Sequence, residues 1–167
     1  MNRWRCSRVC PRLLRRIIGG LVEDTGVVDR RRVVVVDAAN VVGARPDGWW
    51  RDRVGAARRL LVRVAALAER LPDTDVIVVL EGAARRAVEG ADAPDTGQVR
   101  VVLAPGSGDD TIVDVTAEVV AQSHHPAVTV VTADRGLRQR LEPTGAGTTG
   151  PRWLLDQLDG LPQRPTN

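Results

Sequence analysis

Apolar residues occur in short, nearly uninterrupted runs along the chain from residue 33 onward. The runs are Val33 to Val36, Asp75 to Leu80, Val99 to Leu103 and Ala127 to Val131. Short runs rich in β-branched residues are typical of strands buried on both faces, as in a parallel sheet with helices on each side. We predict four strands at these positions and a weaker fifth strand within residues 144–149.

Between these runs the apolar residues recur at helical spacing. From Trp49 to Leu71 they return every three or four positions with arginines between them, which predicts an amphipathic helix. A second helix is expected to begin at Asp109 or Asp110 and to reach about Gln122. Two shorter helices are expected at Arg135 to Leu141 and at Pro151 to Leu158, the latter with proline in its first turn.

The alternation of strands and helices predicts the fold class. It favours a three-layer α/β/α domain with a parallel, mostly five-stranded sheet. The chain has 167 residues, a length that suits one domain. We place this domain at residues 32–160, after a basic, flexible extension at 1–31 and before a C-terminal tail at 161–167.

Charge is distributed unevenly between these segments. Residues 1–32 contain nine arginines and three acidic residues, a net charge of +6. Residues 33–167 contain fifteen arginines and eighteen acidic residues, a net charge of −3. A basic extension is suited to phosphate groups. A start codon assigned upstream of the true domain explains it equally well.

Composition excludes several classes of protein. The chain has no lysine, so neither a P-loop of the usual type nor a Schiff-base lysine is available. It has no Phe or Tyr, which excludes RNA-binding sheets that stack bases on these rings. No apolar run is long enough for a membrane-spanning helix. The two cysteines and an arginine- and alanine-rich composition fit a bacterial cytoplasmic protein.

Acidic residues follow three of the predicted strands at the point where each strand ends. Asp37 follows the first strand, Asp109 and Asp110 follow the third, and Asp134 follows the fourth. The carboxyl ends of parallel strands share one edge of a sheet, where ligands bind in open α/β folds. Two carboxylates about 4 Å apart repel by roughly 4 kcal/mol at an effective dielectric constant near 20. A hard divalent cation, Mg²⁺ or Mn²⁺, would relieve this repulsion.

Each of these residues also has a purely structural explanation. An aspartate at a helix start is often an N-cap, which applies to Asp109 and Asp110. Asp134 suits a turn. Glu81 also ends a strand, and the sequence leaves open whether it joins the cluster or belongs to a turn.

Three short motifs carry a resemblance to a known family. They are D-x-x-N-V at Asp37 to Val41, G-S-G-D-D at Gly106 to Asp110, and T-A-D-R at Thr132 to Arg135. In this order, each after a predicted strand, they resemble the NYN branch of the PIN-like ribonucleases from about residue 32 to 158. The resemblance implies a PIN-like fold and metal-dependent endoribonuclease activity on RNA.

By this resemblance Asp37, Asp109, Asp110 and Asp134 would hold one or two Mg²⁺ or Mn²⁺ ions. Asn40 would orient Asp37 or a metal-bound water. Residues expected to contact the RNA are Arg45, Trp49, Trp50, Arg51, Arg53, Ser107 and Arg135. A structural role for the two tryptophans, as a cap over the helix start, stays open.

One departure from the family keeps other functions open. Some active members carry a further acid one helical turn after the last aspartate, and here that position is Arg138. An inactive or weakly active module that binds RNA or protein is therefore the alternative. A small-molecule phosphatase would want a second aspartate at position 39, which is Ala39. We expect RNA as a partner and no membrane, and a homodimer stays open.

Overall fold

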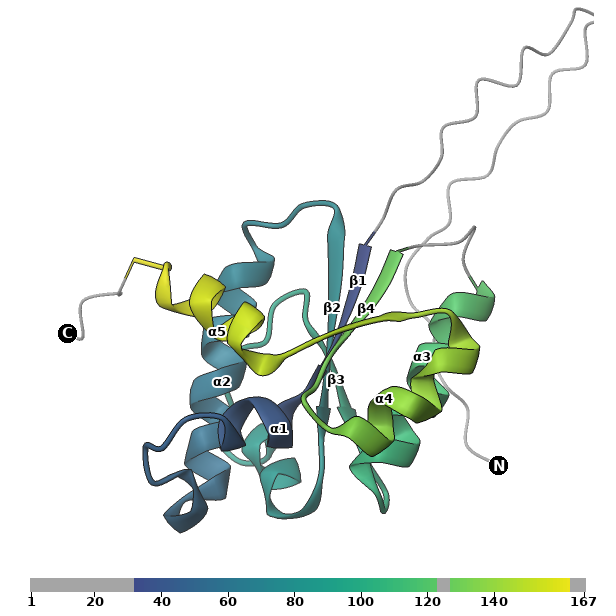
Figure 1. The fold of residues 1–167 in the computed structure, drawn as a ribbon. Helices are drawn as coiled ribbons and strands as arrows, with labels where there is room; N and C mark the ends of the chain where they lie inside the picture. The colour runs from purple at the N-terminus through teal and green to yellow at the C-terminus, as the bar shows by residue number, and fades with distance from the viewer. Residues whose placement is uncertain (1–31, 123–126, 163–167) are drawn as a thin grey trace, which may run out of the picture.

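The computed structural model describes residues 32–122 and 127–162 (Figure 1). The expected basic extension at residues 1–31 and most of the expected C-terminal tail lie outside the described residues. Among the described residues, no helix combines the length and the apolar character needed to cross a membrane.

A five-stranded sheet lies at the centre of the molecule, and all its strand pairs are parallel. Its strand order is β3-β2-β1-β4-β5. The predicted parallel sheet is thus confirmed, with the strands β1 (Arg32–Asp37), β2 (Thr74–Leu80), β3 (Arg100–Leu103), β4 (Ala127–Val131) and β5 (Gly147–Thr149).

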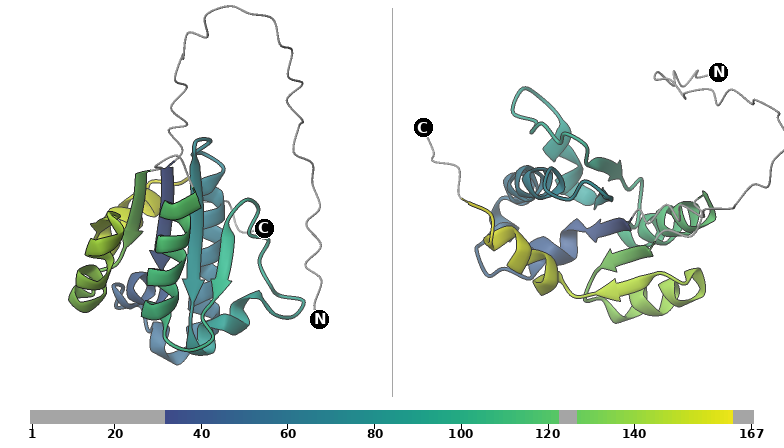
Figure 2. Two further views of the ribbon diagram at one scale, coloured as in Figure 1. Left: turned by 90° about the vertical axis from the view of Figure 1, so that its right-hand side faces the viewer. Right: turned by 90° about the horizontal axis from the view of Figure 1, so that it is seen from above.

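Helices cover both faces of this sheet, which confirms the three-layer architecture (Figure 2). One face is covered by α1 (Ala38–Gly43), α2 (Arg53–Ala68) and α5 (Pro151–Asp159). The other face is covered by α3 (Gly108–Gln122) and α4 (Arg135–Leu141). Three short 3₁₀ helices complete the described elements, namely η1 (Trp49–Arg51), η2 (Gly82–Val88) and η3 (Glu142–Thr144).

The helix expected from Trp49 to Leu71 is divided and shorter. Residues Trp49–Arg51 form η1, and α2 starts only at Arg53 and ends at Ala68. The division falls at Asp52, whose carboxylate accepts a hydrogen bond from the backbone N–H of Gly55 at 2.7 Å. An N-cap of this kind satisfies a donor of the first turn and so defines where the helix begins.

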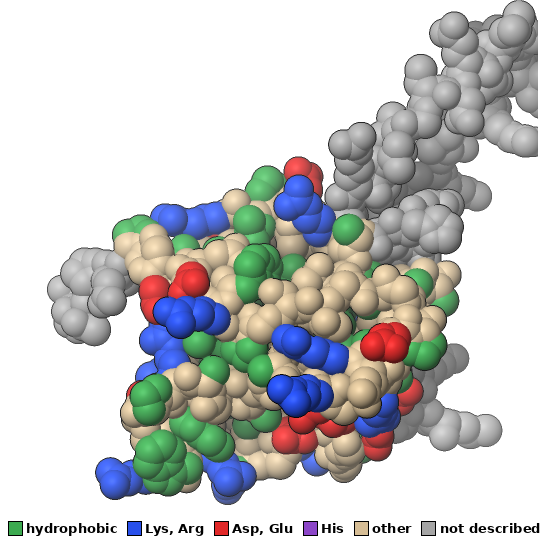
Figure 3. Space-filling model, in the orientation of Figure 1, with side chains coloured by type: hydrophobic (Ala, Val, Ile, Leu, Met, Phe, Trp, Pro, Cys, Tyr) green, Lys and Arg blue, Asp and Glu red, His purple; other side chains and the backbone are tan. Residues whose placement is uncertain are grey.

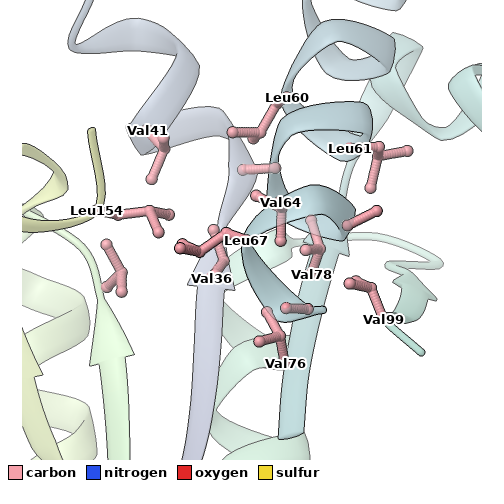
Figure 4. Packing of buried hydrophobic residues seen from close by; sticks show 14 of the residues in the cluster. Val36, Val41, Leu60, Leu61, Val64, Leu67, Val76, Val78, Val99 and Leu154 are labelled. Atoms are coloured by element: carbon pink, nitrogen blue, oxygen red, sulfur yellow. The ribbon is translucent and has the colours of Figure 1, made fainter. Parts of the chain in front are cut away.

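The strands place alternate side chains in two separate cores, because successive residues of a strand point to opposite faces. Val36 of β1 packs with α2 and α5 (Figure 4), and Val34 belongs to the same core. Val33 and Val35 pack with α3 and α4. Both sets are buried, which explains why the strand has no polar position between its first and last residues.

The order of the strands creates a crevice between β1 and β4. From β1 the chain continues to β2 and β3 on one side and then crosses to β4 and β5 on the other. At such a switch point the connections leave in opposite directions, so the space beyond the carboxyl ends of the two strands is open. Asp37 and the residues after Val131 lie beside this opening.

The packing of α2 provides a test of the core. Leu61 is fully buried, while its neighbour Val62 is 53% exposed. We expect Leu61→Ala to lower the free energy of unfolding by about 2–5 kcal/mol, because it removes methyl groups and leaves a cavity. Val62→Ala should change it by no more than about 0.5 kcal/mol. Urea unfolding followed by circular dichroism measures both, and equal effects would contradict this account of the core.

Candidate functional site

Asp37 is the buried carboxylate at the centre of the site. It ends β1, caps α1 and is 7% exposed. One carboxylate oxygen accepts a hydrogen bond from the backbone N–H of Asn40 at 3.0 Å, and the other accepts one from the hydroxyl of Thr132 at 3.0 Å. Burial raises the pKa of Asp37, the two hydrogen bonds oppose this rise, and the nearby carboxylates of Asp109 and Glu81 add to it.

Thr132 connects Asp37 to the segment that follows β4. Its hydroxyl donates to Asp37 and accepts a hydrogen bond from the backbone N–H of Asp134 at 3.1 Å. The side-chain oxygen of Asn40 accepts a hydrogen bond from the backbone N–H of Ala133 at 2.9 Å. These bonds cross the switch point and fix the place of Asp134, whose carboxylate caps α4 through the N–H of Leu137 at 2.8 Å.

Glu81 and Asp109 form the opposite wall. Glu81 follows β2, and its carboxylate accepts a hydrogen bond from the backbone N–H of Gly108 at 2.8 Å. A Cβ at position 108 would lie 2.5 Å from that carboxylate, so glycine permits this close approach. Asp109, in the first turn of α3, is partly buried. Burial raises the pKa of Asp109, Asp134 and Glu81 raise it further, and Arg140 lowers it.

These side chains line one cleft of about 640 Å³. Acidic side chains are visible along the lower edge of the molecule, between α1 and α4 (Figure 3). The cleft brings together three of the four predicted aspartates, the predicted Asn40 and the undecided Glu81, and it adds Arg152 from the first turn of α5. The residues that line it are Asp37, Ala39, Asn40, Gly43, Ala44, Glu81, Gly108, Asp109, Ala133, Asp134, Pro151 and Arg152.

Asp110 does not line this cleft. Its exposed carboxylate forms an ion pair with Arg140 of α4 at 2.6 Å. Adjacent residues of a helix point about 100° apart, so Asp109 and Asp110 face different surroundings. Ser107 accepts a hydrogen bond from the backbone N–H of Asp110 at 3.4 Å, as a cap of α3, and like the exposed Arg135 it lies outside the cleft lining.

Two of the residues expected to contact RNA lie in a hollow beside the cleft. Trp49 and Arg53 line it together with Ala39 and Glu81, which also line the cleft. The guanidinium of Arg53 lies 5.5 Å from the ring centroid of Trp49, a cation–π distance. Trp50 packs edge-on against Trp49 and is 53% exposed.

Arg45 and Arg51, which were also expected to contact RNA, are placed differently. Arg45 forms an ion pair with Asp159 at the end of α5. Arg51 is exposed in η1 and lines neither the cleft nor the hollow beside it.

Asn40 and Arg138 contact the site in ways that the motif did not indicate. The backbone of Asn40, rather than its side chain, contacts Asp37, and its amide side chain holds Ala133. Arg138 donates two hydrogen bonds to the backbone carbonyl of Thr132, at 3.0 and 2.7 Å. Arg138, noted above as a departure from the family pattern, therefore supports the segment that carries Asp134.

Sequence reasoning missed two residues of the site and left a third undecided. Thr132 belongs to the T-A-D-R motif, and its place directly after a strand was the available signal. Glu81, the undecided residue, follows a strand in the same way as Asp37. Arg152 had no signal, because nothing in the sequence shows that the first turn of α5 returns to the carboxyl ends of β1 and β4.

The oxygen donors of the cleft meet the needs of a metal ion in part. No group of three or more His, Cys, Asp or Glu among the described residues is arranged to hold a metal by itself. Asp37, Asp109 and Asp134 nevertheless supply hard oxygen atoms to one open cleft. Burial raises the pKa values of Asp37 and Asp109, and neighbouring carboxylates add to both rises. Mg²⁺ typically keeps several waters and binds through one or two carboxylates plus substrate phosphates. The residues therefore fit a hydrated ion that is completed by substrate.

Comparison with known proteins shows a likeness of fold. No protein-family model and no curated protein matches the chain. Among solved structures, it is similar to Rae1 (YacP) from Bacillus subtilis, crystallised as a tryptophan-to-leucine mutant. The TM-score is 0.59 at 19% sequence identity, over 77% of this chain and 75% of that chain. The likeness supports the PIN-like fold expected from the motifs.

The raised pKa of Asp37 predicts how stability depends on pH. A carboxyl whose folded pKa exceeds its ordinary value of 3.8 favours folding while protonated, and this contribution is lost as the pH rises through the folded pKa. Asp37→Asn cannot ionise. We expect its free energy of unfolding, relative to wild type, to increase from below pH 3.8 toward neutrality. Urea unfolding across this range measures the difference.

For Thr132→Val we expect the free energy of unfolding, relative to wild type, to decrease as the pH rises. This substitution removes a hydrogen bond that favours the charged form of Asp37, so its loss of stability relative to wild type should be larger at neutral pH than in acid. If neither variant showed a difference that depends on pH, burial of Asp37 would not control its ionisation.

Proposed function

We propose that the protein is a metal-dependent ribonuclease that hydrolyses RNA phosphodiester bonds in the cleft at the carboxyl edge of the sheet. The observation that carries the proposal is the placement of Asp37, Asp109 and Asp134 on one cleft at the switch point between β1 and β4. The motifs that contain these residues resemble NYN ribonucleases, and the PIN-like fold agrees with that resemblance.

A divalent ion in this cleft would be held by Asp37, Asp109 and Asp134. When bound, such an ion makes a water molecule more acidic and polarises a phosphoryl oxygen. Asp110 is left out of this set because it pairs with Arg140 outside the cleft.

The remaining residues of the site position these carboxylates. Thr132 donates to Asp37 and so favours its charged form. Glu81 holds the first residue of α3, which sets the direction of Asp109. Arg152 is the cation in the cleft lining and is suited to a phosphate oxygen, since a guanidinium offers planar, paired donors.

The hollow of Trp49 and Arg53 gives the substrate a second point of contact. An aromatic ring backed by a cation is suited to an unpaired base, and stacking of this kind contributes about 1–3 kcal/mol per base. The hollow shares Ala39 and Glu81 with the cleft, so a base placed there belongs to a nucleotide near the scissile phosphate.

A binding module without activity is the second candidate. It is favoured by the lack of a group of three acids, among the described residues, that would hold a metal without substrate. Such a protein would bind RNA equally well with and without a divalent ion.

Substitution of the cleft aspartates tests the proposal. We expect Asp37→Asn, Asp109→Asn and Asp134→Asn each to reduce Mn²⁺-dependent cleavage of labelled single-stranded RNA by about 100-fold or more, because each removes a ligand charge. Mn²⁺ should also raise the midpoint of thermal unfolding of the wild type, and this rise should shrink in each variant.

Asp114→Asn is the matched control. It removes the same charge from a position on α3 that does not line the cleft, and it should leave both cleavage and the response to Mn²⁺ near wild type. RNA binding without cleavage, unaffected by Mn²⁺ in the wild type and in all variants, would instead support the binding module.

A further inference from the structure

A chain of hollows extends from the acidic cleft along α5. The next hollow shares Ala44 and Arg152 with the cleft, and a third hollow, of about 230 Å³, shares Arg45 and Leu155 with the second. The third lies between α1, α2 and α5, with Leu60 among the apolar residues that line it. Neighbouring hollows share wall residues, and the second and third hollows are together called here the α5 groove.

Arginines occur along the whole α5 groove. Arg152 lies where it joins the cleft, Arg45 lies in the middle, and Arg59 and Arg63 of α2 line its far end. Basic and acidic side chains lie side by side over α2 and α5 in Figure 3. The arginines come from three segments distant in sequence, so the groove is a product of the fold.

Two of these arginines converge on a single oxygen atom. The guanidinium groups of Arg45 and Arg63 lie 2.5 and 2.7 Å from the same carboxylate oxygen of Asp159. The side chain of Asp159 is 54% exposed, while those of the two arginines are 34% and 35% exposed. Hydrogen bonds from both arginines lower the pKa of Asp159. The two cations are thus held in place around an anion that solvent can reach.

The geometry matches what a phosphate oxygen requires. A guanidinium group binds the oxygens of a phosphate with the same donors that it uses for the oxygens of a carboxylate. Ion pairs at the surface contribute little to folding, so an incoming anion can exchange with Asp159 at low cost. Asp159 therefore occupies the place that a phosphate oxygen would take.

We propose that the α5 groove binds the phosphate backbone of single-stranded RNA beside the scissile bond, and that Asp159 holds Arg45 and Arg63 ready until a phosphate displaces it. This inference rests on the ribonuclease function proposed above. The groove starts at the cleft, and four arginines and three aspartates (Asp47, Asp156 and Asp159) line it among the described residues. The remaining positive charge suits a polyanion that extends from the reacting phosphate. The Trp49 hollow, which shares Ala39 and Glu81 with the cleft, suits an unpaired base, and this combination favours a single strand.

The test is equilibrium binding of a fluorescein-labelled single-stranded RNA oligonucleotide of mixed sequence to the full chain. Fluorescence anisotropy is measured in EDTA, so that no cleavage occurs, at several salt concentrations. The variants are Asp159→Asn and Arg63→Gln, with Asp156→Asn as the matched control. Asp156→Asn removes the same charge from the same groove, but it leaves the carboxylate oxygen on which Arg45 and Arg63 converge. Thermal unfolding verifies that each variant is folded.

Asp159→Asn should bind RNA about three- to thirtyfold more tightly than Asp156→Asn, because the two arginines no longer need to exchange partners. Arg63→Gln should weaken binding and reduce the slope of log Kd against log salt by about 0.7, the value for a single strand with one fewer neutralised phosphate. Equal affinities for Asp159→Asn and Asp156→Asn, or an unchanged slope for Arg63→Gln, would overturn the proposal and leave the ion pairs as links from α5 to α2 and to the segment after α1.

Cleavage in Mn²⁺, measured separately on the same samples, distinguishes the two proposals. Tighter binding by Asp159→Asn without cleavage by wild type would contradict the ribonuclease function alone. Cleavage by wild type with no difference between Asp159→Asn and Asp156→Asn would contradict the α5 groove alone.

Discussion

The hydrogen bond between Thr132 and Asp37 is the interaction on which the rest of the site depends. It joins the carboxyl ends of the neighbouring strands β1 and β4, and both side chains are buried. Burial opposes the charge on Asp37, so donors must lie close to it for the carboxylate to ionise. The same hydroxyl fixes the backbone of Asp134, so one side chain sets both the ionisation of the first carboxylate and the position of another.

The second wall of the cleft, formed by Glu81 and Asp109, is also held by a hydrogen bond. Glu81 is held by the first N–H of α3, and this hydrogen bond lets Asp109 approach Asp37 despite their repulsion. The two walls come from opposite sides of the switch point, since Glu81 follows β2 whereas Asp134 follows β4. Burial raises the pKa of Asp109, and the neighbouring carboxylates of Asp134 and Glu81 add to this rise. Their repulsion makes a cation favourable in the cleft. The fold therefore creates the cluster of negative charge that the divalent ion of the proposed function would neutralise.

Much of this arrangement could be predicted from local pattern, and the rest could not for physical reasons. The uninterrupted apolar runs predicted the strands and hence the shared edge, and Asp37 stood out because it ends such a run. Asp109 and Asp110 were indistinguishable, because an ion pair to Arg140, thirty residues away in sequence, directs Asp110 elsewhere. Arg152 could not be predicted for the same reason, because its place in the cleft depends on how α5 packs against the sheet. Local sequence predicts which edge of the sheet carries the carboxylates. Contacts between residues distant in sequence determine which of them line the cleft.

Helix capping and a role in the candidate site are compatible explanations for Asp37 and Asp134. The sequence presented them as alternatives, yet Asp37 and Asp134 both cap helices and both line the cleft. A carboxylate has two oxygens and about four lone-pair sites, so one backbone N–H leaves capacity for other partners. The cap also restricts the side chain to one direction, and preorganisation of this kind is what a binding or catalytic group requires. In Asp134 one oxygen is bound to the first turn of α4, which directs the rest of the carboxylate toward the cleft. The helix starts therefore act as the supports of the site, and losing a cap would loosen a candidate ligand as well as a helix.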